Sequence, residues 1–131
     1  NPNAVIPSYS REGDAGLDLT IISVEKVDDE HIKYGFGIAV EIPKGYVGYI
    51  YPRSSCYKHR QILSNAVGVI DSNYRGEISA VFIGTNTFYR YEVGQRCAQL
   101  IISPIPAIEL EEVEELSDTN RGSNGYGSSG K

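Results

Sequence analysis

The sequence predicts a single all-β domain, a sandwich or barrel of short strands, followed by a flexible C-terminal tail. The dominant hydrophobic period is two residues, which is the repeat of a strand with one buried face. Turn residues separate the periodic stretches, as in all-β folds. The 131 residues include fourteen Gly and ten Tyr. Long helix formers gather in only one acidic stretch. A chain of this length suits one domain with one hydrophobic core.

Six stretches are predicted as strands because apolar side chains alternate along them. The clearest is 36–42, where Phe36, Ile38, Val40 and Ile42 share one face. Residues 43–45, which read Pro-Lys-Gly, form the turn to the next strand. In chain order the predicted strands are 17–24, 36–42, 46–51, 77–83, 88–91 and 98–103.

Helix is expected at one place in the first half, the turn 54–60, with Ser54 as its cap. The stretch 110–116 fits a short strand or a short helix equally well. Residues 117–131 have almost nothing to bury and so cannot offset the cost of ordering their backbone. We therefore predict a β domain over 1–116 and an arm over 117–131.

Two interpretations of the arm remain open. The simpler one is a flexible tail. In the other the arm closes over a ligand: its single Arg and single aromatic residue bind, and its glycines let backbone N–H groups approach phosphate oxygens.

Composition excludes several classes of function. The net charge of −5 disfavours a general nucleic-acid binder, which needs excess positive charge. No apolar run reaches the roughly 18 residues of a membrane span. No secretory signal is visible at the N-terminus, and two cysteines do not form a disulfide framework. We expect free thiols in an intracellular, reducing compartment, cytoplasm or nucleus.

A small basic cluster lies in the middle of this acidic chain, at Arg53, Lys58, His59 and Arg60. Such a cluster suits a compact phosphorylated ligand better than a polymer. Cys56 has one other potential metal ligand nearby, His59, but one pair falls short of the four ligands of a structural zinc site, so such a site is not expected.

Four candidate positions each have a plain and a functional interpretation. Asp18 is a solvated or turn-bonded carboxylate, or a site residue. Residues 53–55 open the predicted helical turn, where free N–H groups suit a phosphate, although serines are also ordinary caps. Asp71 follows the apolar run 66–70 and could act as a general base or simply start the turn that follows. Gln99 lies in an apolar strand, where amides are usually structural hydrogen-bond partners.

Taken together, five ordered segments resemble the motifs of the trimeric dUTPase family. They read AGLDL (15–19), PRSS (52–55), GVIDSNYRG (68–76), GQRCAQL (94–100) and RGSNGYGSSG (121–130), and they extend over nearly the whole chain. The resemblance implies a mostly antiparallel, jelly-roll-type β-barrel with very little helix. It also implies a homotrimer whose active sites are shared between subunits, with the C-terminal arm closing over a neighbour's site.

The same resemblance implies the activity: hydrolysis of dUTP to dUMP and pyrophosphate with Mg²⁺, by attack of water on the α-phosphorus. This reaction limits uracil in DNA and supplies dUMP for thymidylate synthesis. Asp71 matches the carboxylate that activates the water. Tyr74 matches the tyrosine under the deoxyribose, which leaves no room for a 2′-hydroxyl. Asn65 and the hairpin around Gly68 match the family residues that lie against the uracil base.

Phosphate and metal contacts are implied for the remaining motif residues. Arg53, Ser54, Ser55 and Gln99 match the phosphate side. Asp18 matches a carboxylate that positions hydrated Mg²⁺ through water, since this ion keeps several waters. The arm would place Arg121 at the terminal phosphate, Tyr126 over the uracil, and Gly127, Ser128 and Ser129 around the phosphates.

Several positions depart from the family pattern. Asn73 stands where many members have Asp or Gly. Tyr126 replaces the commoner Phe, a change that should still allow stacking. Ser129 replaces the commoner Thr, and Asn124 replaces the commoner Gly. The segment 56–61 matches the family pattern least well.

Two alternatives come with the resemblance. One is a dCTP deaminase. That family has a similar fold and uses a glutamate for deamination, within a third motif of different sequence. Glu77 is a glutamate in that region, but 70–76 matches the hydrolase. The other is a dUTPase-like regulatory protein whose main role is to contact another protein.

Overall fold

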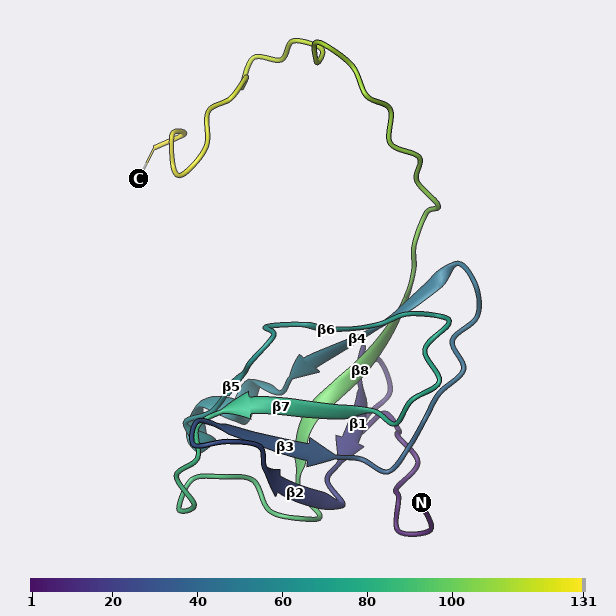
Figure 1. Cartoon of the computed structure of the whole chain (residues 1–131), viewed down its shortest axis with the longest axis vertical. Coiled ribbons are helices and arrows are strands. Elements are labelled where there is room, and N and C mark those ends of the chain that lie inside the picture. Colours follow the sequence, from purple (N-terminus) through teal and green to yellow (C-terminus); the bar gives the residue numbers. More distant parts are fainter. Residues whose placement is uncertain (131) are drawn as a thin grey trace.

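The protein forms two four-stranded antiparallel sheets that face each other, as a computed structural model of residues 1–130 shows (Figure 1). One sheet has the strand order β1-β8-β4-β6 and the other β2-β3-β7-β5. The all-β prediction is confirmed. The elements are β1 (Leu17–Thr20), β2 (Ser23–Lys26), β3 (His31–Gly35), β4 (Tyr46–Pro52), the 3₁₀ helix η1 (Ser54–His59), β5 (Ile62–Leu63), β6 (Gly68–Ile70), β7 (Ser79–Ile83) and β8 (Arg96–Pro104).

Three predicted strands are confirmed with small shifts of their ends, as β4, β7 and β8. The predicted strand 17–24 is in fact two strands, β1 and β2, which belong to different sheets. The chain crosses between the sheets at Ile21 and Ile22. The Ile21 N–H donates to the Gln95 carbonyl at 2.9 Å, and the Ile22 N–H donates to the Gly35 carbonyl at 2.9 Å.

The predicted strand 36–42 is wrong as a strand, although its burial pattern holds. Phe36 and Ile42 are buried and Glu41 is exposed. Gly37 has a φ of 69°, in the left-handed region, and this interrupts the extended conformation. The regular strand lies just before it, as β3, which the sequence pattern did not single out.

The predicted strand 88–91 is also wrong, because these residues form a turn. The side chain of Asn86 accepts a hydrogen bond from the Phe88 N–H at 3.0 Å, and the Asn86 carbonyl accepts from the N–H groups of Tyr89 and Arg90 at 3.1 Å. An Asn that bonds its own backbone in this way favours a turn over a strand. The stretch 110–116 is neither strand nor helix.

The predicted helical turn 54–60 is confirmed as η1. Its N-cap residue is Arg53 rather than Ser54, and the Arg53 side chain makes no capping hydrogen bond. The turn at 43–45 is confirmed as well, because the Tyr46 N–H donates to the Pro43 carbonyl at 3.1 Å.

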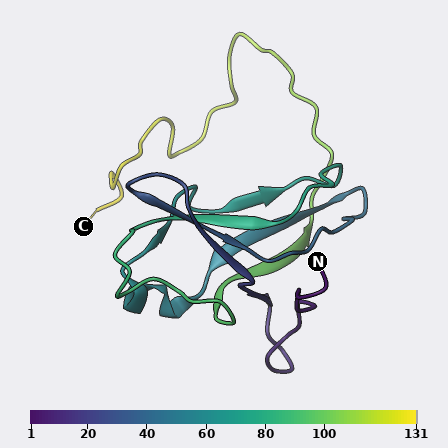
Figure 2. The ribbon, with the colours of Figure 1, turned by 60° about the horizontal axis from the view of Figure 1, so that its bottom comes forward.

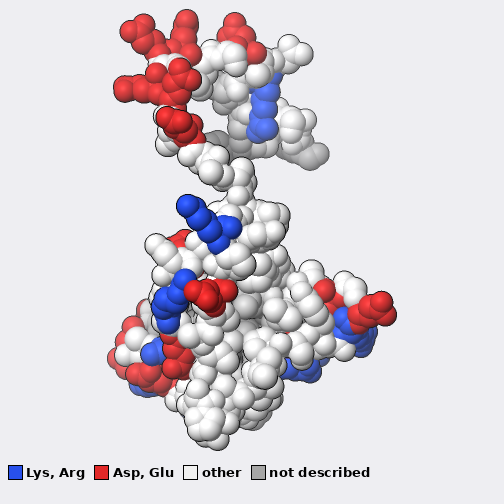
Figure 3. Space-filling model, turned by 90° about the vertical axis from the view of Figure 1, so that its right-hand side faces the viewer, with Lys and Arg blue, Asp and Glu red and all other residues white. Residues whose placement is uncertain are grey.

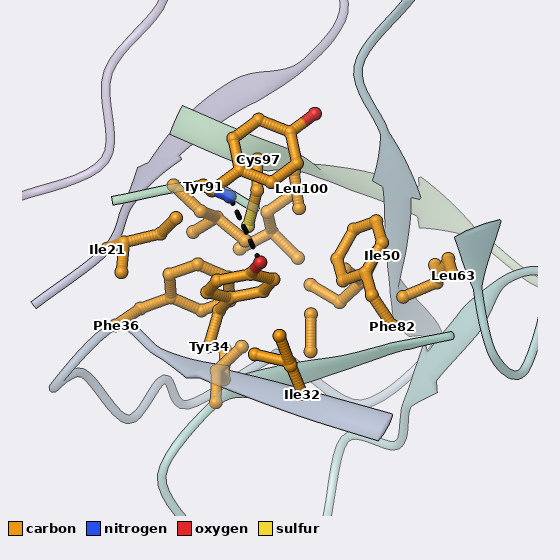
Figure 4. Close-up of a cluster of buried hydrophobic side chains, with 14 residues drawn as sticks. Ile21, Ile32, Tyr34, Phe36, Ile50, Leu63, Phe82, Tyr91, Cys97 and Leu100 are labelled. Carbon is orange, nitrogen blue, oxygen red and sulfur yellow. Dashed lines mark hydrogen bonds between the residues drawn. The ribbon is translucent and has the colours of Figure 1, made fainter. Parts of the chain in front are cut away.

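One hydrophobic cluster fills the space between the sheets (Figure 4). At its centre the Tyr34 hydroxyl donates to Gln61 Oε1 at 2.7 Å and accepts from the Tyr91 N–H at 3.1 Å. The amide of Gln61 in turn donates to the Gly84 carbonyl at 2.6 Å. Each polar group in this series of hydrogen bonds has a partner, so the series links β3 to two loops at little desolvation cost.

Cys97 and Ala98 are neighbours in β8, yet both are fully buried. In the pairing of β1 with β8, Leu19 faces Ala98 and Thr20 faces Arg96, so Cys97 is an extra residue in the ladder. Such a bulge turns two successive side chains toward the same face. Both thiols of the chain are free.

From residue 105 to residue 130 the chain forms neither helix nor strand. Figures 1 and 2 show this segment leaving the end of β8 and curving away from the sandwich. Acidic side chains gather on it (Figure 3); they belong to Glu109, Glu111, Glu112, Glu114, Glu115 and Asp118. Within residues 1–130, no helix is long and apolar enough to cross a membrane.

Burial raises the pKa of the Cys97 thiol from 9.0 to about 12. Because the unfolded thiol ionises near pH 9 and the folded one does not, stability is full below pH 9 and falls as pH rises. We expect this thiol to lower the free energy of unfolding by about 1 kcal/mol between pH 9 and pH 10. Urea unfolding at the two pH values measures the decline.

The variant Cys97→Ala should lose this part of the decline, and Cys56→Ala, which removes the other thiol, is the matched control. An unchanged decline in Cys97→Ala would assign it to other groups.

Candidate active site

Strand β8 brings together residues from three of the five sequence segments. It is paired with β1 on one side and β4 on the other. In this register Gln99 lies opposite Asp18 of β1 and opposite Tyr51 of β4. The end of β4 leads directly into Arg53 and η1. The predicted site residues Asp18, Arg53, Ser54 and Gln99 therefore meet at one edge of the sheet.

The Asp18 carboxylate is the electrostatic centre of this cluster. Its Oδ1 lies 3.3 Å from Arg53 Nε and its Oδ2 lies 3.1 Å from Arg96 Nη1. The Ser10 hydroxyl also donates to Oδ2. The Asp18 side chain is only 14% exposed, and its charge is balanced by a charge-assisted hydrogen bond from Arg96 and an ion pair with Arg53.

A cavity of about 470 Å³ opens beside this cluster, and all four predicted residues line it. Its charged lining is three arginines (Arg11, Arg53, Arg96) and two aspartates (Asp14, Asp18), a net charge of +1. Positive charge, hydroxyls and an amide together suit the oxygens of a phosphorylated ligand. Ser55 lines a different cavity, on the other side of Arg53 and Arg96.

Gln99 is held in place by two contacts. Its Nε2 donates to the Pro52 carbonyl at 3.1 Å. Its side chain lies directly over Gly16, where an added Cβ would come within 2.2 Å of Gln99 Oε1. Gly16 is therefore the position that leaves room for this amide, a role that the sequence alone did not assign.

A second cavity, of about 260 Å³, lies between β6 and β7 and includes Asn65 and Gly68 in its lining. The chain enters it through a tight turn in which Ala66 has a φ of 60°. At Gly68, an added Cβ would approach the Ile50 Cβ to 3.0 Å. The missing side chain at Gly68 thus keeps this turn close to the sheet.

Asp71 follows β6 and is exposed in the single chain. It lines a third cavity of about 320 Å³, together with Asn73, Tyr46 and Ile105. The predicted turn is confirmed, because the Tyr74 N–H donates to the Asp71 carbonyl at 3.1 Å. Asp71 thus starts the turn and also places its carboxylate at a cavity, so the two interpretations of this residue do not exclude each other.

Tyr74 is 43% exposed, and its hydroxyl donates to the Glu77 carbonyl at 3.1 Å. The ring lies over Gly76, where an added Cβ would come within 2.3 Å of the Tyr74 hydroxyl. The glycine therefore leaves room for the ring against the turn, and the Tyr74 side chain stays partly exposed to solvent.

The predicted residues of the arm are not brought to the rest of the site within one chain. Arg121 Nε donates to the Asn124 carbonyl at 2.9 Å, and Ser128 N–H donates to the Gly125 carbonyl at 3.1 Å, so these contacts are local. Tyr126 is fully exposed. Figure 1 shows the arm standing clear of the sheets. Gly127 and Ser129 lie in the same exposed turns.

Among residues 1–130, no group of three or more His, Cys, Asp or Glu side chains could hold a metal ion. The Asp18 carboxylate already has two arginines and a hydroxyl on its oxygens. It therefore suits contact with a hydrated ion through water better than direct coordination.

Arg96 is the charged contact of Asp18 that the sequence analysis missed, along with the hydroxyl contact from Ser10. It lies in the segment 94–100, shortly before Gln99, and its spacing alone gave no sign that it would pair with Asp18. Only the register of β1 against β8 places the two together.

Comparisons with known proteins agree across the whole chain. The dUTPase family profile matches residues 2–130. The deoxyuridine 5′-triphosphate nucleotidohydrolase of Nautilia profundicola is 43% identical over 136 residues, covering 100% of this chain and 94% of that protein. The enzyme of the same name from Picosynechococcus is 39% identical over 133 residues, covering 99% of this chain and 94% of that protein.

Solved structures show the same similarity in three dimensions. The dUTPase of Staphylococcus bacteriophage 80alpha, solved with dUpNHpp, has a TM-score of 0.85 and 29% identity and covers 100% of this chain and 95% of that one. A mutant of the dUTPase from S. aureus phage phi11, described with a structural Mg(II) ion, has a TM-score of 0.72 and 26% identity and covers 88% of this chain and 93% of that one.

The variant Gly16→Ala should displace Gln99 and break its hydrogen bond to Pro52. We expect a loss of about 1–3 kcal/mol in the free energy of unfolding, the usual cost of overpacking a close contact. Urea unfolding measures it, and the NMR signals of the Gln99 side-chain amide report the displacement. Gly125→Ala, where an added Cβ meets nothing within 4 Å, is the control and should change stability little. If the Gln99 amide signals did not move in Gly16→Ala, the proposed contact would be wrong.

Proposed function

The chain belongs to the dUTPase family, and from that premise we propose that its active site is assembled between copies of the chain in a homotrimer. The protein is a dUTP diphosphatase, which hydrolyses dUTP to dUMP and pyrophosphate by attack of water on the α-phosphorus. The reaction limits uracil in DNA and supplies dUMP for thymidylate synthesis. Its fold is of the antiparallel jelly-roll type found in the dUTPases that it resembles in structure.

The observation that carries the assignment of roles is the positively charged cavity beside β8. It gathers Asp18, Arg53, Ser54 and Gln99 from three separate segments of the sequence. We assign this cavity to the triphosphate, and place Ser55 beside it. There, guanidinium and amide donors would stabilise the charge that develops as pyrophosphate leaves.

The segment around β6 is assigned to the nucleoside and the water. The turn with Asn65 and Gly68 lines a cavity of about 260 Å³, which we assign to uracil. The exposed face of Tyr74 takes the deoxyribose, and a 2′-hydroxyl would collide with the ring. Asp71, next along the chain, accepts the proton of the attacking water.

Mg²⁺ fits this site as a hydrated ion bound by the phosphates, with Asp18 acting through water. When bound, the ion neutralises phosphate charge and so favours attack at the α-phosphorus. The two arginine contacts of Asp18 hold its carboxylate in a fixed position at the edge of the cavity.

Two features support assembly from several chains. The assigned residues lie in three separate cavities and on a distant arm. The segment after β8 also exposes large apolar side chains, with Ile108 at 78% and Leu110 at 91%. A neighbouring chain would cover such side chains.

We assign 1–116 to the β domain and 117–131 to an arm that closes a neighbour's site. In the arm, Arg121 binds the terminal phosphate and Tyr126 stacks on uracil, while Gly127, Ser128 and Ser129 surround the phosphates. We also propose an intracellular, reducing compartment, in keeping with the two free thiols.

Pyrophosphate release from dUTP with Mg²⁺, measured beside dCTP, dTTP and UTP, tests this function. We expect release from dUTP alone. Asp71→Asn should keep dUTP binding but lower kcat by about 10²–10⁴-fold, the usual contribution of a general base. Asp29→Asn changes an exposed carboxylate far from the site and is the matched control.

Unchanged kcat in Asp71→Asn would remove Asp71 from the role of base. Ammonia release from dCTP would favour the deaminase alternative. Binding of dUTP without turnover by the unchanged chain would favour the regulatory alternative.

Truncation after Leu116 should leave a folded trimer with weak activity. Losing one charge-assisted hydrogen bond of Arg121 costs about 1.5–3 kcal/mol, which lowers kcat/KM by about 10- to 100-fold. The point variant Arg121→Ala should reproduce much of this loss in the full chain. Light scattering and thermal unfolding check assembly and folding, and a truncated chain that failed to fold would make the tail structural instead.

A further inference from the structure

The Tyr91 hydroxyl is buried and has no hydrogen-bond partner within residues 1–130. Tyr91 is only 1% exposed. Leaving a buried hydroxyl unpaired is destabilising, and native proteins rarely leave one without a reason. The hydroxyl therefore indicates a partner outside this chain's own side chains.

The Tyr91 ring is held firmly, so the direction of its hydroxyl is fixed. The ring stacks on His59 with a centroid distance of 3.6 Å. It also packs edge-to-face with Tyr34, at a centroid distance of 5.6 Å, and in a tilted arrangement with Phe82, at 6.0 Å. His59 is fixed in turn, with Nδ1 2.8 Å from the Tyr89 carbonyl. Figure 4 shows the Tyr91 hydroxyl pointing away from the hydrophobic cluster.

Tyr91 lines a cavity of about 310 Å³ that is separate from the three cavities assigned above. Arg53, Arg96, His59 and Ser55 also line it, and no carboxylate among the described residues does. The lining thus combines two permanent positive charges with hydroxyl donors. Such a set of donors selects an anion with several oxygen acceptors.

Burial raises the pKa of the Tyr91 phenol above its ordinary value, while the nearby Arg53 guanidinium acts in the opposite direction. Because the net shift is upward, the phenol stays protonated at neutral pH and can donate a hydrogen bond to an oxygen of an anion. The cavity volume leaves room for a phosphate-sized ion and several waters.

We propose that this cavity is a binding site for a small oxyanion of the phosphate type. The anion accepts a hydrogen bond from the Tyr91 hydroxyl and lies against the guanidinium groups of Arg53 and Arg96. The site shares Arg53 and Arg96 with the triphosphate cavity, but its defining residue, Tyr91, lines only this second cavity.

Calorimetric titration of the full chain with inorganic phosphate, in chloride buffer of matched ionic strength, tests the proposal. Tyr91→Phe removes only the hydroxyl and should weaken phosphate binding by about 10- to 100-fold, the value of a hydrogen bond to a charged group. Tyr49→Phe, in the middle of β4, is the matched control and should bind as the unchanged chain does.

Gln99→Ala separates the two neighbouring cavities, because Gln99 lines only the triphosphate side. Phosphate binding that survives in Gln99→Ala and is lost in Tyr91→Phe supports the proposal. The reverse pattern, or no phosphate binding by the unchanged chain, overturns it.

Thermal unfolding without phosphate gives a second readout. Tyr91→Phe should unfold at the same temperature as the unchanged chain or higher, because it removes an unpaired buried hydroxyl. A lower unfolding temperature would mean that water or a neighbouring chain already pairs with the hydroxyl, and would also overturn the proposal.

Discussion

The site depends on one constraint, the position of β8 between β1 and β4. The register of β8 is set by both neighbouring strands. Gln99 lies opposite Asp18 in the pairing with β1 and opposite Tyr51 in the pairing with β4. Because side chains alternate along a strand, a slip of one residue would turn Gln99 to the opposite face. The bulge at Cys97 then lets β8 bury two successive residues and still return Arg96 to the side of Asp18. The cluster of Asp18 and two arginines is thus a product of sheet register.

Glycines and buried tyrosines position the other side chains of the site and of the core. Gly16 leaves room for the Gln99 side chain, and Gly76 leaves room for the Tyr74 side chain. A Cβ atom at either glycine would occupy that space. Tyr34 joins the second sheet to two loops through hydrogen bonds that are fully paired, which makes it a source of rigidity. Tyr91 packs in the same cluster, but its hydroxyl has no partner within residues 1–130, and this contrast singles it out as a binding group.

A single chain holds only parts of the proposed site. The phosphate side, the nucleoside side and the arm lie apart, and the segment after β8 exposes Ile108 and Leu110 to solvent. In the single chain nothing covers these side chains, and contact with another copy in a symmetric assembly would bury them. The departure at Asn73 lies beside Asp71, and those at 56–61 lie in η1 and just after it. They therefore change the surroundings of the assigned residues without replacing them.

The sequence by itself determined the all-β class, the strands β4, β7 and β8, the turn at Asp71 and the family, because a period of two residues and ordered motifs are local signals. It failed at 36–42 and 88–91, where a left-handed Gly37 and the Asn86 side chain override the apolar pattern. Only the tertiary structure decided that Arg96 pairs with Asp18, that Gly16 makes room for Gln99, and that the Tyr91 hydroxyl finds no partner in the described chain. These facts follow from which strands lie side by side, and contacts between residues about 80 positions apart leave no local trace in a single sequence.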